Sequence, residues 1–170
     1  MQKRAPKAVQ PPSDAKSSEH LQFGEIEVSI CDQTLTLRRG QEIRCYPISS
    51  SRFGLGTEEG SKKTPLGRFR IARKIGADMP PGTVFRARVP LTPEDELPDT
   101  EDLITSRILW LDGIDEHNAN TKQRYIYIHG TKHEDRIGRP DSHGCIRMRN
   151  ADVIELFDLV QEGTHVRIIG

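Results

Sequence analysis

The sequence has few cysteines, no net charge and no long apolar segment, and each absence argues against a class of protein. Three cysteines in 170 residues are too few for a disulfide scaffold, and their odd number leaves at least one unpaired within the chain. The 25 basic and 25 acidic side chains cancel, so there is no overall field for nucleic acid or an anionic membrane surface. No apolar run reaches the roughly 20 residues that span a bilayer. The sequence therefore argues against a nucleic-acid binder, a basic membrane-surface module and a membrane-spanning protein.

Two of the cysteines, Cys31 and Cys45, lie in a segment that reads as three short strands, at 28–31, 34–37 and 42–48. If the two intervening turns have two residues each, Cys31 faces Thr34, which in turn faces Cys45. The two thiols are then two strand spacings apart, about 9.5 Å, whereas a disulfide needs Cα atoms within about 7 Å. We therefore predict that both thiols are free.

The first twenty residues differ in composition from the rest. They hold prolines, scattered charges, Ser and Gln, with almost no large apolar side chain, so they cannot offset their ordering entropy. They also lack the roughly 7–15-residue apolar stretch of a secretory signal. We predict a disordered tail or linker over 1–20 and a single domain over 21–170, close to the prior of about 150 residues per domain.

That domain is predicted to be mostly β, with one clear C-terminal helix and long loops. Short segments rich in β-branched and aromatic residues predict strands at 68–72, 108–111, 125–128 and 164–169. In the helix, Asn150 is the expected N-cap, Val153 to Val160 carry the apolar positions, and Gly163 closes it. The Pro-, Asp- and Glu-rich stretch 77–101 is longer than a compact connection needs, and we expect part of it to form a lid beside a cleft.

The chemistry is concentrated between Tyr125 and Met148. A predicted strand delivers His129 and Gly130, and Cys145 follows 16 residues after His129, so the intervening loop can return the thiol to the imidazole. A free thiol has a pKa of about 8.5 and is mostly protonated at pH 7. A neighbouring imidazole can take that proton and later give it to a leaving amine. The spacing therefore predicts a cysteine nucleophile with a histidine general base.

The residues around Cys145 suit acyl transfer. The backbone N–H groups of His143, Gly144 and Cys145 could converge on an oxyanion. Arg147 projects to the same face as Cys145 if the segment is extended, where its guanidinium could bind a substrate carboxylate. We also predict substrate contacts for Ser142 and Tyr127.

Two other interpretations stay open at this point. Cys145 could be a small buried apolar residue and His129 a structural strand-end residue. Alternatively, four zinc donors are present, namely His129, His133, His143 and Cys145. The i, i+4 spacing of the first two histidines brings them together only on a helix, whereas the segment reads as a strand followed by Gly130. We therefore expect no metal.

The pattern closely resembles the signature of the L,D-transpeptidase (YkuD-type) catalytic domain. The signature consists of His129-Gly130, a short loop and Ser142-His-Gly-Cys-Ile-Arg147. Upstream, Ser49 to Gly54 and Thr64-Pro-Leu-Gly67 look like the N-terminal segments of that family, and the resemblance covers nearly all of 21–170. It implies a mostly-β, sandwich-like catalytic domain.

The resemblance also implies a function in peptidoglycan biosynthesis, and with it in cell-wall biogenesis and cell shape. A cysteine acyltransferase of this family takes a stem tetrapeptide, releases the terminal D-alanine, and passes the acyl group from a thioester to an amine, giving a 3→3 cross-link or a protein attachment. Carried over to this sequence, Cys145 is the nucleophile, His129 the base and acid, and the Gly130 carbonyl orients the imidazole. No metal or organic cofactor is implied, and carbapenem β-lactams are expected as covalent inhibitors.

Three alternatives remain open beside this function. The same thioester could be hydrolysed, which would make the protein an L,D-carboxypeptidase, and a zinc hydrolase or a non-enzymatic wall-binding domain are further possibilities. The resemblance implies a periplasmic or wall-associated location, although the sequence shows no export signal. The acceptor, the preferred third stem residue and the oligomeric state do not follow from the sequence.

Overall fold

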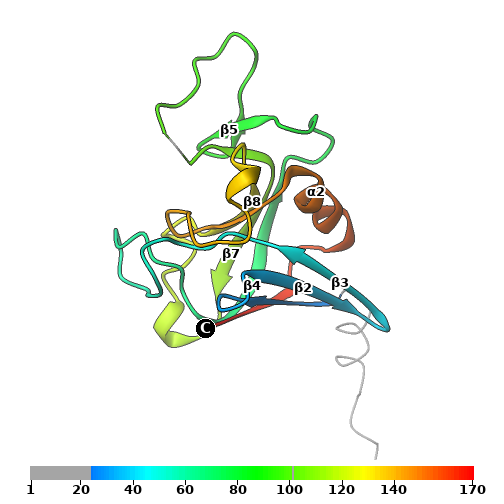
Figure 1. Ribbon diagram of the computed structural model, residues 1–170, viewed down its shortest axis with the longest axis vertical. Helices are drawn as coiled ribbons and strands as arrows, with labels where there is room; N and C mark the ends of the chain where they lie inside the picture. Colours follow the sequence, from blue (N-terminus) through cyan, green and yellow to red (C-terminus); the bar gives the residue numbers. More distant parts are fainter. Residues whose placement is uncertain (1–23, 101) are drawn as a thin grey trace, which may run out of the picture.

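The computed structural model describes residues 24–100 and 102–170, and the predicted tail at 1–20 lies outside these residues. Strands dominate the described chain, and they form a curled sheet with one α-helix, α2 (Asn150–Leu159), packed beside it (Figure 1). The prediction of a mostly-β fold with a C-terminal helix is confirmed.

The ten strands of the described residues belong to one sheet, which branches at its longest strand, so the layers expected of a sandwich are parts of a single curled sheet. The main path runs β3-β2-β1-β10-β4-β7-β5-β6, and β8 pairs with both β7 and β9. In chain order the strands are β1 (Glu25–Ser29), β2 (Thr34–Arg39), β3 (Glu42–Pro47), β4 (Gly67–Ile75), β5 (Val84–Arg86), β6 (Val89–Pro90), β7 (Ile104–Gly113), β8 (Tyr127–Gly130), β9 (Ile146–Met148) and β10 (His165–Ile169). Two short 3₁₀ helices, η1 (Glu116–Asn118) and η2 (Glu134–Arg136), lie in the connections.

Cys31 and Cys45 are both free, as predicted, and both are exposed, but the strand register behind the prediction is wrong. The turn between β1 and β2 has four residues rather than two, so Cys31 lies in the turn itself. Cys45 pairs with Thr36 and not with Thr34. Gln33, the last residue of this turn, has a positive φ of 51°, a conformation that its residue type does not predict.

Several other element boundaries differ from the prediction. The strand expected at 125–128 begins at Tyr127, because Tyr125 has a left-handed φ of 55° and lies in a turn closed by its N–H bond to the Lys122 carbonyl. The helix begins at Asn150, with Arg149 rather than Asn150 as its N-cap, and it ends at Leu159, well before Gly163. The stretch 77–101 contains a short hairpin, β5–β6, that its polar composition conceals.

Two clusters of apolar side chains lie on opposite faces of the central strands. The main core fills the space between the sheet and α2, and β7 and β8 contribute Leu109, Leu111 and Ile128 to it. A smaller core on the other face contains Phe85, Ile108 and Tyr127, with Trp110 and Cys145 packed against it. Because side chains alternate along each strand, those on one face pack into the main core and those on the other face toward the smaller core.

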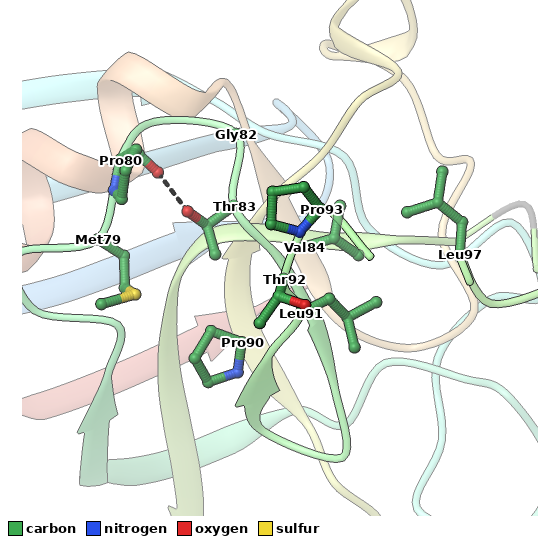
Figure 2. A pocket seen from close by; sticks show the side chains of 10 residues that line it. All are labelled: Met79, Pro80, Gly82, Thr83, Val84, Pro90, Leu91, Thr92, Pro93 and Leu97. Carbon is green, nitrogen blue, oxygen red and sulfur yellow. Dashed lines mark hydrogen bonds between the residues drawn. The ribbon is translucent and has the colours of Figure 1, made fainter. Parts of the chain in front are cut away.

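The stretch 77–101 is attached to the body by β5, which pairs with the start of β7 and buries Phe85 in the smaller core. Beyond that attachment it projects from the body around the β5 label in Figure 1. Its outer part encloses a pocket of about 460 Å³ that is lined by Pro80, Val84, Leu91 and Leu97 among others (Figure 2). A hydrogen bond from the Thr83 hydroxyl to the Pro80 carbonyl, 2.7 Å long, closes one wall.

Among the described residues, no helix is long and apolar enough to cross a membrane.

Candidate active site

The predicted catalytic residues lie on one face of the branch formed by β7, β8 and β9. Tyr127 is paired with Trp110 of β7, and His129 is paired with Arg147 of β9. Because alternate residues of a strand share a face, Tyr127 and His129 project to the same side, and Cys145 and Arg147 project there with them. The intervening Ile128 and Ile146 point into the main core on the opposite face. The sheet register thus brings the histidine and the cysteine together.

The loop that carries the thiol is held in shape by its own backbone and by the segment around Thr64. Gly144 adopts a φ of 124°, which an L side chain rarely does. The Ser142 hydroxyl donates to the Cys145 carbonyl at 2.6 Å, and the Thr64 hydroxyl donates to the Gly144 carbonyl at 3.0 Å. Ser51 forms a bridge to Ser142. These contacts fix Cys145 at the entrance to β9.

The two upstream segments quoted for the family resemblance therefore have a structural explanation. Ser49 pairs with Arg147, Ser51 pairs with Ser142, and Thr64 holds Gly144. Both segments line the backbone of the cysteine loop, although they lie far from it in sequence.

The thiol of Cys145 contacts the backbone of the segment leading into β8. It donates to the Tyr125 carbonyl at 3.4 Å and accepts the Tyr127 N–H at 3.3 Å. Burial raises the pKa of Cys145 to about 12, and the charge of Asp102 adds to this, while the Tyr127 N–H and the charges of Arg147 and Arg124 oppose it. At neutral pH this thiol is protonated.

His129 is buried, with 1% of its surface exposed, and its ring is fixed by the next residue. Nδ1 lies 2.6 Å from the Gly130 carbonyl, the contact that the resemblance implied, so Nδ1 carries the proton and Nε2 is left as the basic nitrogen. Burial lowers the pKa of His129, although Asp102 and the Gly130 carbonyl oppose the shift. Gly130 cannot be replaced without a clash, because a Cβ there would lie 2.6 Å from the Thr105 carbonyl.

Cys145 and His129 are diagonal neighbours on adjacent parallel strands. Cys145 precedes Ile146, which pairs with Ile128, so His129 is one strand across and two residues further along. This separates their Cα atoms by about 8 Å, within the reach of an imidazole and a thiol that turn toward each other. Over residues 24–100 and 102–170, no hydrogen bond joins the sulfur to the imidazole, since the thiol is directed at Tyr125. A rotation about the Cα–Cβ bond of Cys145 would redirect it.

Arg147 is the largest fully buried side chain among the described residues, and its charge is neutralised inside the protein. Its Nε lies 2.7 Å from Asp102 Oδ1, and Nη1 lies 2.6 Å from Asp141 Oδ2. Asp141 also pairs with Arg136. The structure therefore uses Arg147 to join the cysteine strand to two loops, and its predicted contact with substrate stays a prediction that these pairs do not favour.

The other two residues predicted to contact substrate, Ser142 and Tyr127, also form hydrogen bonds within the protein. Ser142 is fully buried, and its hydroxyl donates a hydrogen bond to the Cys145 carbonyl. Tyr127 is buried up to its hydroxyl, which accepts a hydrogen bond from Arg88 Nη1 at 3.1 Å. A direct contact between either residue and substrate stays a prediction.

The three amides proposed for an oxyanion differ in their present partners. The N–H of His143 donates to Asp102 Oδ2 at 3.2 Å, and the N–H of Gly144 donates to the Ser142 hydroxyl at a long 3.3 Å. The amide of His143 is thus held by a charged acceptor, whereas the weak bond of Gly144 is easily exchanged for a stronger acceptor. Of these two amides, that of Gly144 is the better oxyanion donor.

Aromatic rings and cations form two walls beside the thiol. On one side Trp110 packs against Tyr125 and Tyr127, with ring centroids 5.8 Å apart in each pair. On the other side Phe53 packs against His143 at 5.7 Å, and the Arg52 guanidinium contacts both rings. The site therefore offers apolar surfaces with positive charge at their edges.

The four zinc donors named from the sequence are not brought together. Within 24–100 and 102–170 no group of three or more His, Cys, Asp or Glu side chains is arranged to hold a metal ion. His133 lies on the loop before η2, and His143 contacts Arg52.

Two residues of the site escaped the sequence analysis. Asp102 is close enough to influence His129, Arg147 and Cys145, yet in the sequence it is one of several acidic residues in a polar stretch. Asn150, expected as a helix cap, instead accepts bonds from Thr105 and Ser106 and donates to the Thr131 carbonyl, behind Gly130. The sequence around each residue does not indicate its role, because the role depends on contacts between segments that are distant in the chain.

Comparison with known proteins agrees with this architecture. The model of the YkuD family, the L,D-transpeptidase catalytic domain, matches residues 24–168. A putative L,D-transpeptidase, YkuD from Bacillus subtilis, is 34% identical over 144 residues, which is 84% of this chain and 64% of the relative. The chain thus spans somewhat less than two thirds of that relative.

Solved structures show the same fold. An L,D-transpeptidase from Mycobacterium smegmatis superposes with a TM-score of 0.57 at 20% identity, covering 87% of this chain and 59% of the other. The L,D-transpeptidase LdtMt1, solved in complex with imipenem, gives 0.55 at 21% identity, covering 86% and 59%. This protein belongs to the L,D-transpeptidase (YkuD) catalytic domain family.

Proposed function

We propose that the protein is a cysteine-dependent L,D-transpeptidase that acts on peptidoglycan stem peptides. The observation that carries the proposal is the placement of Cys145 and His129 on one face of adjacent strands, with His129 Nδ1 bound to the Gly130 carbonyl. A nucleophile, a base with its second nitrogen fixed, and nearby backbone amides are what acyl transfer requires.

The first half of the reaction forms a thioester. His129 Nε2 removes the proton from the Cys145 thiol as the sulfur attacks the carbonyl carbon of the third stem residue. The tetrahedral oxyanion is held by the amides of Gly144 and Cys145. When the intermediate collapses, the C–N bond to D-alanine breaks, the proton passes from His129 to the leaving amine, and the acyl group stays on sulfur.

In the second half the thioester is resolved by an acceptor. His129 takes a proton from an incoming amine, the new amide bond forms, and the C–S bond breaks to regenerate the thiol. The product is a 3→3 cross-link or an attached protein. Water in place of the amine gives a free tripeptide, and the protein would then be an L,D-carboxypeptidase.

We also propose that the protein works where its polymeric substrate lies, in the periplasm or at the cell wall. β-Lactams of the carbapenem type are proposed as covalent ligands of Cys145, since L,D-transpeptidases of the same fold have been solved with imipenem and with a faropenem-derived adduct. A strained lactam carbonyl would be attacked by the same sulfur that attacks the stem peptide.

The test is release of D-alanine from a disaccharide-tetrapeptide by the purified full chain. We expect the wild type and Cys45→Ala to release D-alanine, and Cys145→Ala to release none while keeping its thermal stability. Intact mass spectrometry should show one imipenem adduct on the first two proteins and none on the third. A fully active Cys145→Ala variant, or an adduct on Cys31 or Cys45 alone, would refute the proposal.

The same incubation identifies the acceptor. Accumulation of a cross-linked dimer indicates amine transfer, whereas accumulation of the disaccharide-tripeptide indicates hydrolysis.

A further inference from the structure

Arg88 occupies the turn of the β5–β6 hairpin in a fixed and unusual backbone conformation. Only Ala87 and Arg88 lie between the two strands, and their φ angles are 47° and 68°. A two-residue hairpin turn of this hand suits Asn-Gly, and an arginine in the left-handed region is strained. Strain of this kind often accompanies a functional requirement for the side chain.

The guanidinium of Arg88 lies on the aromatic wall next to the catalytic cysteine. Its central carbon is 4.9 Å from the Trp110 ring centroid and 5.0 Å from that of Tyr125. Nη1 donates to the Tyr127 hydroxyl at 3.1 Å. The backbone of the same two tyrosines contacts the Cys145 sulfur, so the guanidinium and the thiol share one wall of the site.

Among the described residues, no acidic side chain neutralises the charge of Arg88. No carboxylate within 24–100 and 102–170 forms an ion pair with it, whereas Arg147 pairs with Asp102 and Asp141. Within the described part of the chain, the hydrogen bond to Tyr127 uses one of the five N–H donors of the Arg88 guanidinium. The ammonium of Lys122, 5.6 Å from the Trp110 ring and likewise without an ion pair in this part of the chain, adds a second positive charge.

This arrangement reverses the roles expected of the arginines. Arg147 was predicted to bind substrate, but its charge is balanced by two buried pairs and it has almost no exposed surface. Arg88 is only partly buried, and its guanidinium lies over the Trp110 and Tyr125 rings. A guanidinium in this position keeps N–H donors that can bind the two oxygens of a carboxylate.

We propose that Arg88 is a specificity-determining residue that binds a carboxylate of the donor stem peptide. The inference rests on the proposed function, because it takes the stem as the ligand. Two carboxylates fit the chemistry: the terminal carboxylate of the leaving D-alanine, or a side-chain carboxylate on the third residue, a diamino acid.

Binding to the unreactive Cys145→Ala protein, measured by calorimetry, separates recognition from turnover. Three tetrapeptide stems serve as probes: one with diaminopimelate and one with lysine at the third position, both with a free C-terminus, and the lysine stem as its C-terminal amide. We expect Arg88→Gln to weaken binding of a recognised stem by about 10–100-fold, the usual value of a charge-assisted hydrogen bond. Arg88→Lys, which keeps the charge, should recover part of the lost affinity for the stem.

The pattern across the stems identifies the carboxylate. A loss confined to the diaminopimelate stem assigns the side-chain group, and a loss on both free-acid stems but not on the amide assigns the terminal group. Arg86→Gln is the matched control, since Arg86 lies on the same hairpin and contacts the Glu96 carbonyl away from the site. It should leave the binding of all three stems unchanged.

Two results would overturn the inference, and they are distinguishable. If Cys145→Ala binds stems and Arg88→Gln binds them equally well, the inference alone is wrong. If Cys145→Ala binds no stem, the proposed function fails as well. Unchanged melting temperatures of the Arg88 variants exclude a loss of binding through unfolding.

Discussion

The environment of the Cys145 sulfur favours the neutral thiol over the thiolate. Burial raises the pKa of Cys145 to about 12, so the thiol is neutral at pH 7. His129 has a lowered pKa and is neutral at the same pH. The resting pair is therefore a thiol and an imidazole rather than a thiolate and an imidazolium, and proton transfer accompanies attack on the substrate.

This gives a prediction for pH dependence in a Cys31→Ser, Cys45→Ser background, where Cys145 is the remaining thiol. Its rate of alkylation by iodoacetamide should keep rising beyond about pH 9, and no thiolate absorbance should be visible at pH 7. Acylation by a stem peptide should persist through neutral pH and fall in acid, where His129 protonates, because burial lowers the pKa of His129. Stopped-flow absorbance and alkylation kinetics measure these quantities.

Cys145→Ser in the same background is the control and should give no alkylation. A preformed ion pair would instead give a thiolate signal at neutral pH and an alkylation rate that is already constant there.

At the residue scale, the sequence predicts the site residues that lie together in one motif, and it does not predict those that the fold brings in from distant segments. His129, Gly130 and the 142–147 segment carry their own pattern, and the structure places them together. Asp102 and Arg88 come from a stretch in which similar residues recur, so no local pattern separates them from their neighbours. The interactions that single them out, with Arg147 and with Trp110, span large distances in the chain.

At the scale of elements, the stretch 77–101 combines a fixed base with a projecting outer part. Phe85 is 3% exposed in the smaller core, against the face that carries Tyr127 and Cys145. Removing the whole stretch would therefore remove core packing together with Arg88. The predicted lid can be no more than the outer segment, and its movement stays a prediction.

We expect Phe85→Ala to reduce the free energy of unfolding by about 3–5 kcal/mol, the usual cost of removing a buried aromatic ring. Val89→Ala on the same hairpin is the control, because Val89 is 61% exposed and should cost less than about 0.5 kcal/mol. Urea unfolding of both variants provides the comparison. Equal stabilities of the two variants would show that β5 is not part of the core.

The strand and helix boundaries show where sequence patterns stop being informative. The alternation from Tyr125 to Ile128 predicts a strand, but the left-handed φ of Tyr125 shifts its start to Tyr127. The β5–β6 hairpin has a turn without Asn or Gly, so it lacks the usual hairpin signal. In both places the tertiary structure imposes a backbone conformation that the residue types do not predict.

At the scale of the whole molecule, Arg147 joins three parts of the chain through buried charges. It connects β9 to Asp102, next to the projecting stretch, and to Asp141, at the end of the loop that follows β8. Burial raises the pKa of both aspartates, but His129 and Arg147 around Asp102, and Arg147 with Arg136 around Asp141, outweigh it. Both pKa values lie below 3.8 as a result.

A depressed carboxyl pKa stabilises the folded state only where the carboxylate is ionised. The contribution of these pairs is thus fully present above about pH 4 and is lost as the pH falls through the lowered pKa values. We expect Arg147→Gln to lower the free energy of unfolding by about 3–5 kcal/mol at pH 7, since the partly buried Asp102 loses its ion-pair partner and Asp141 keeps only Arg136. The loss should shrink near pH 2–3, where the carboxylates of both proteins become protonated.

Urea unfolding at the two pH values tests this, with Arg70→Gln as the matched control. Arg70 pairs with Asp112 at an exposed position of β4, where an ion pair contributes at most about 1 kcal/mol. A loss for Arg147→Gln that is equal at both pH values would assign its role to packing of the side chain instead of charge. A loss as small as that of Arg70→Gln would show that the buried pairs do not hold the cysteine strand in place.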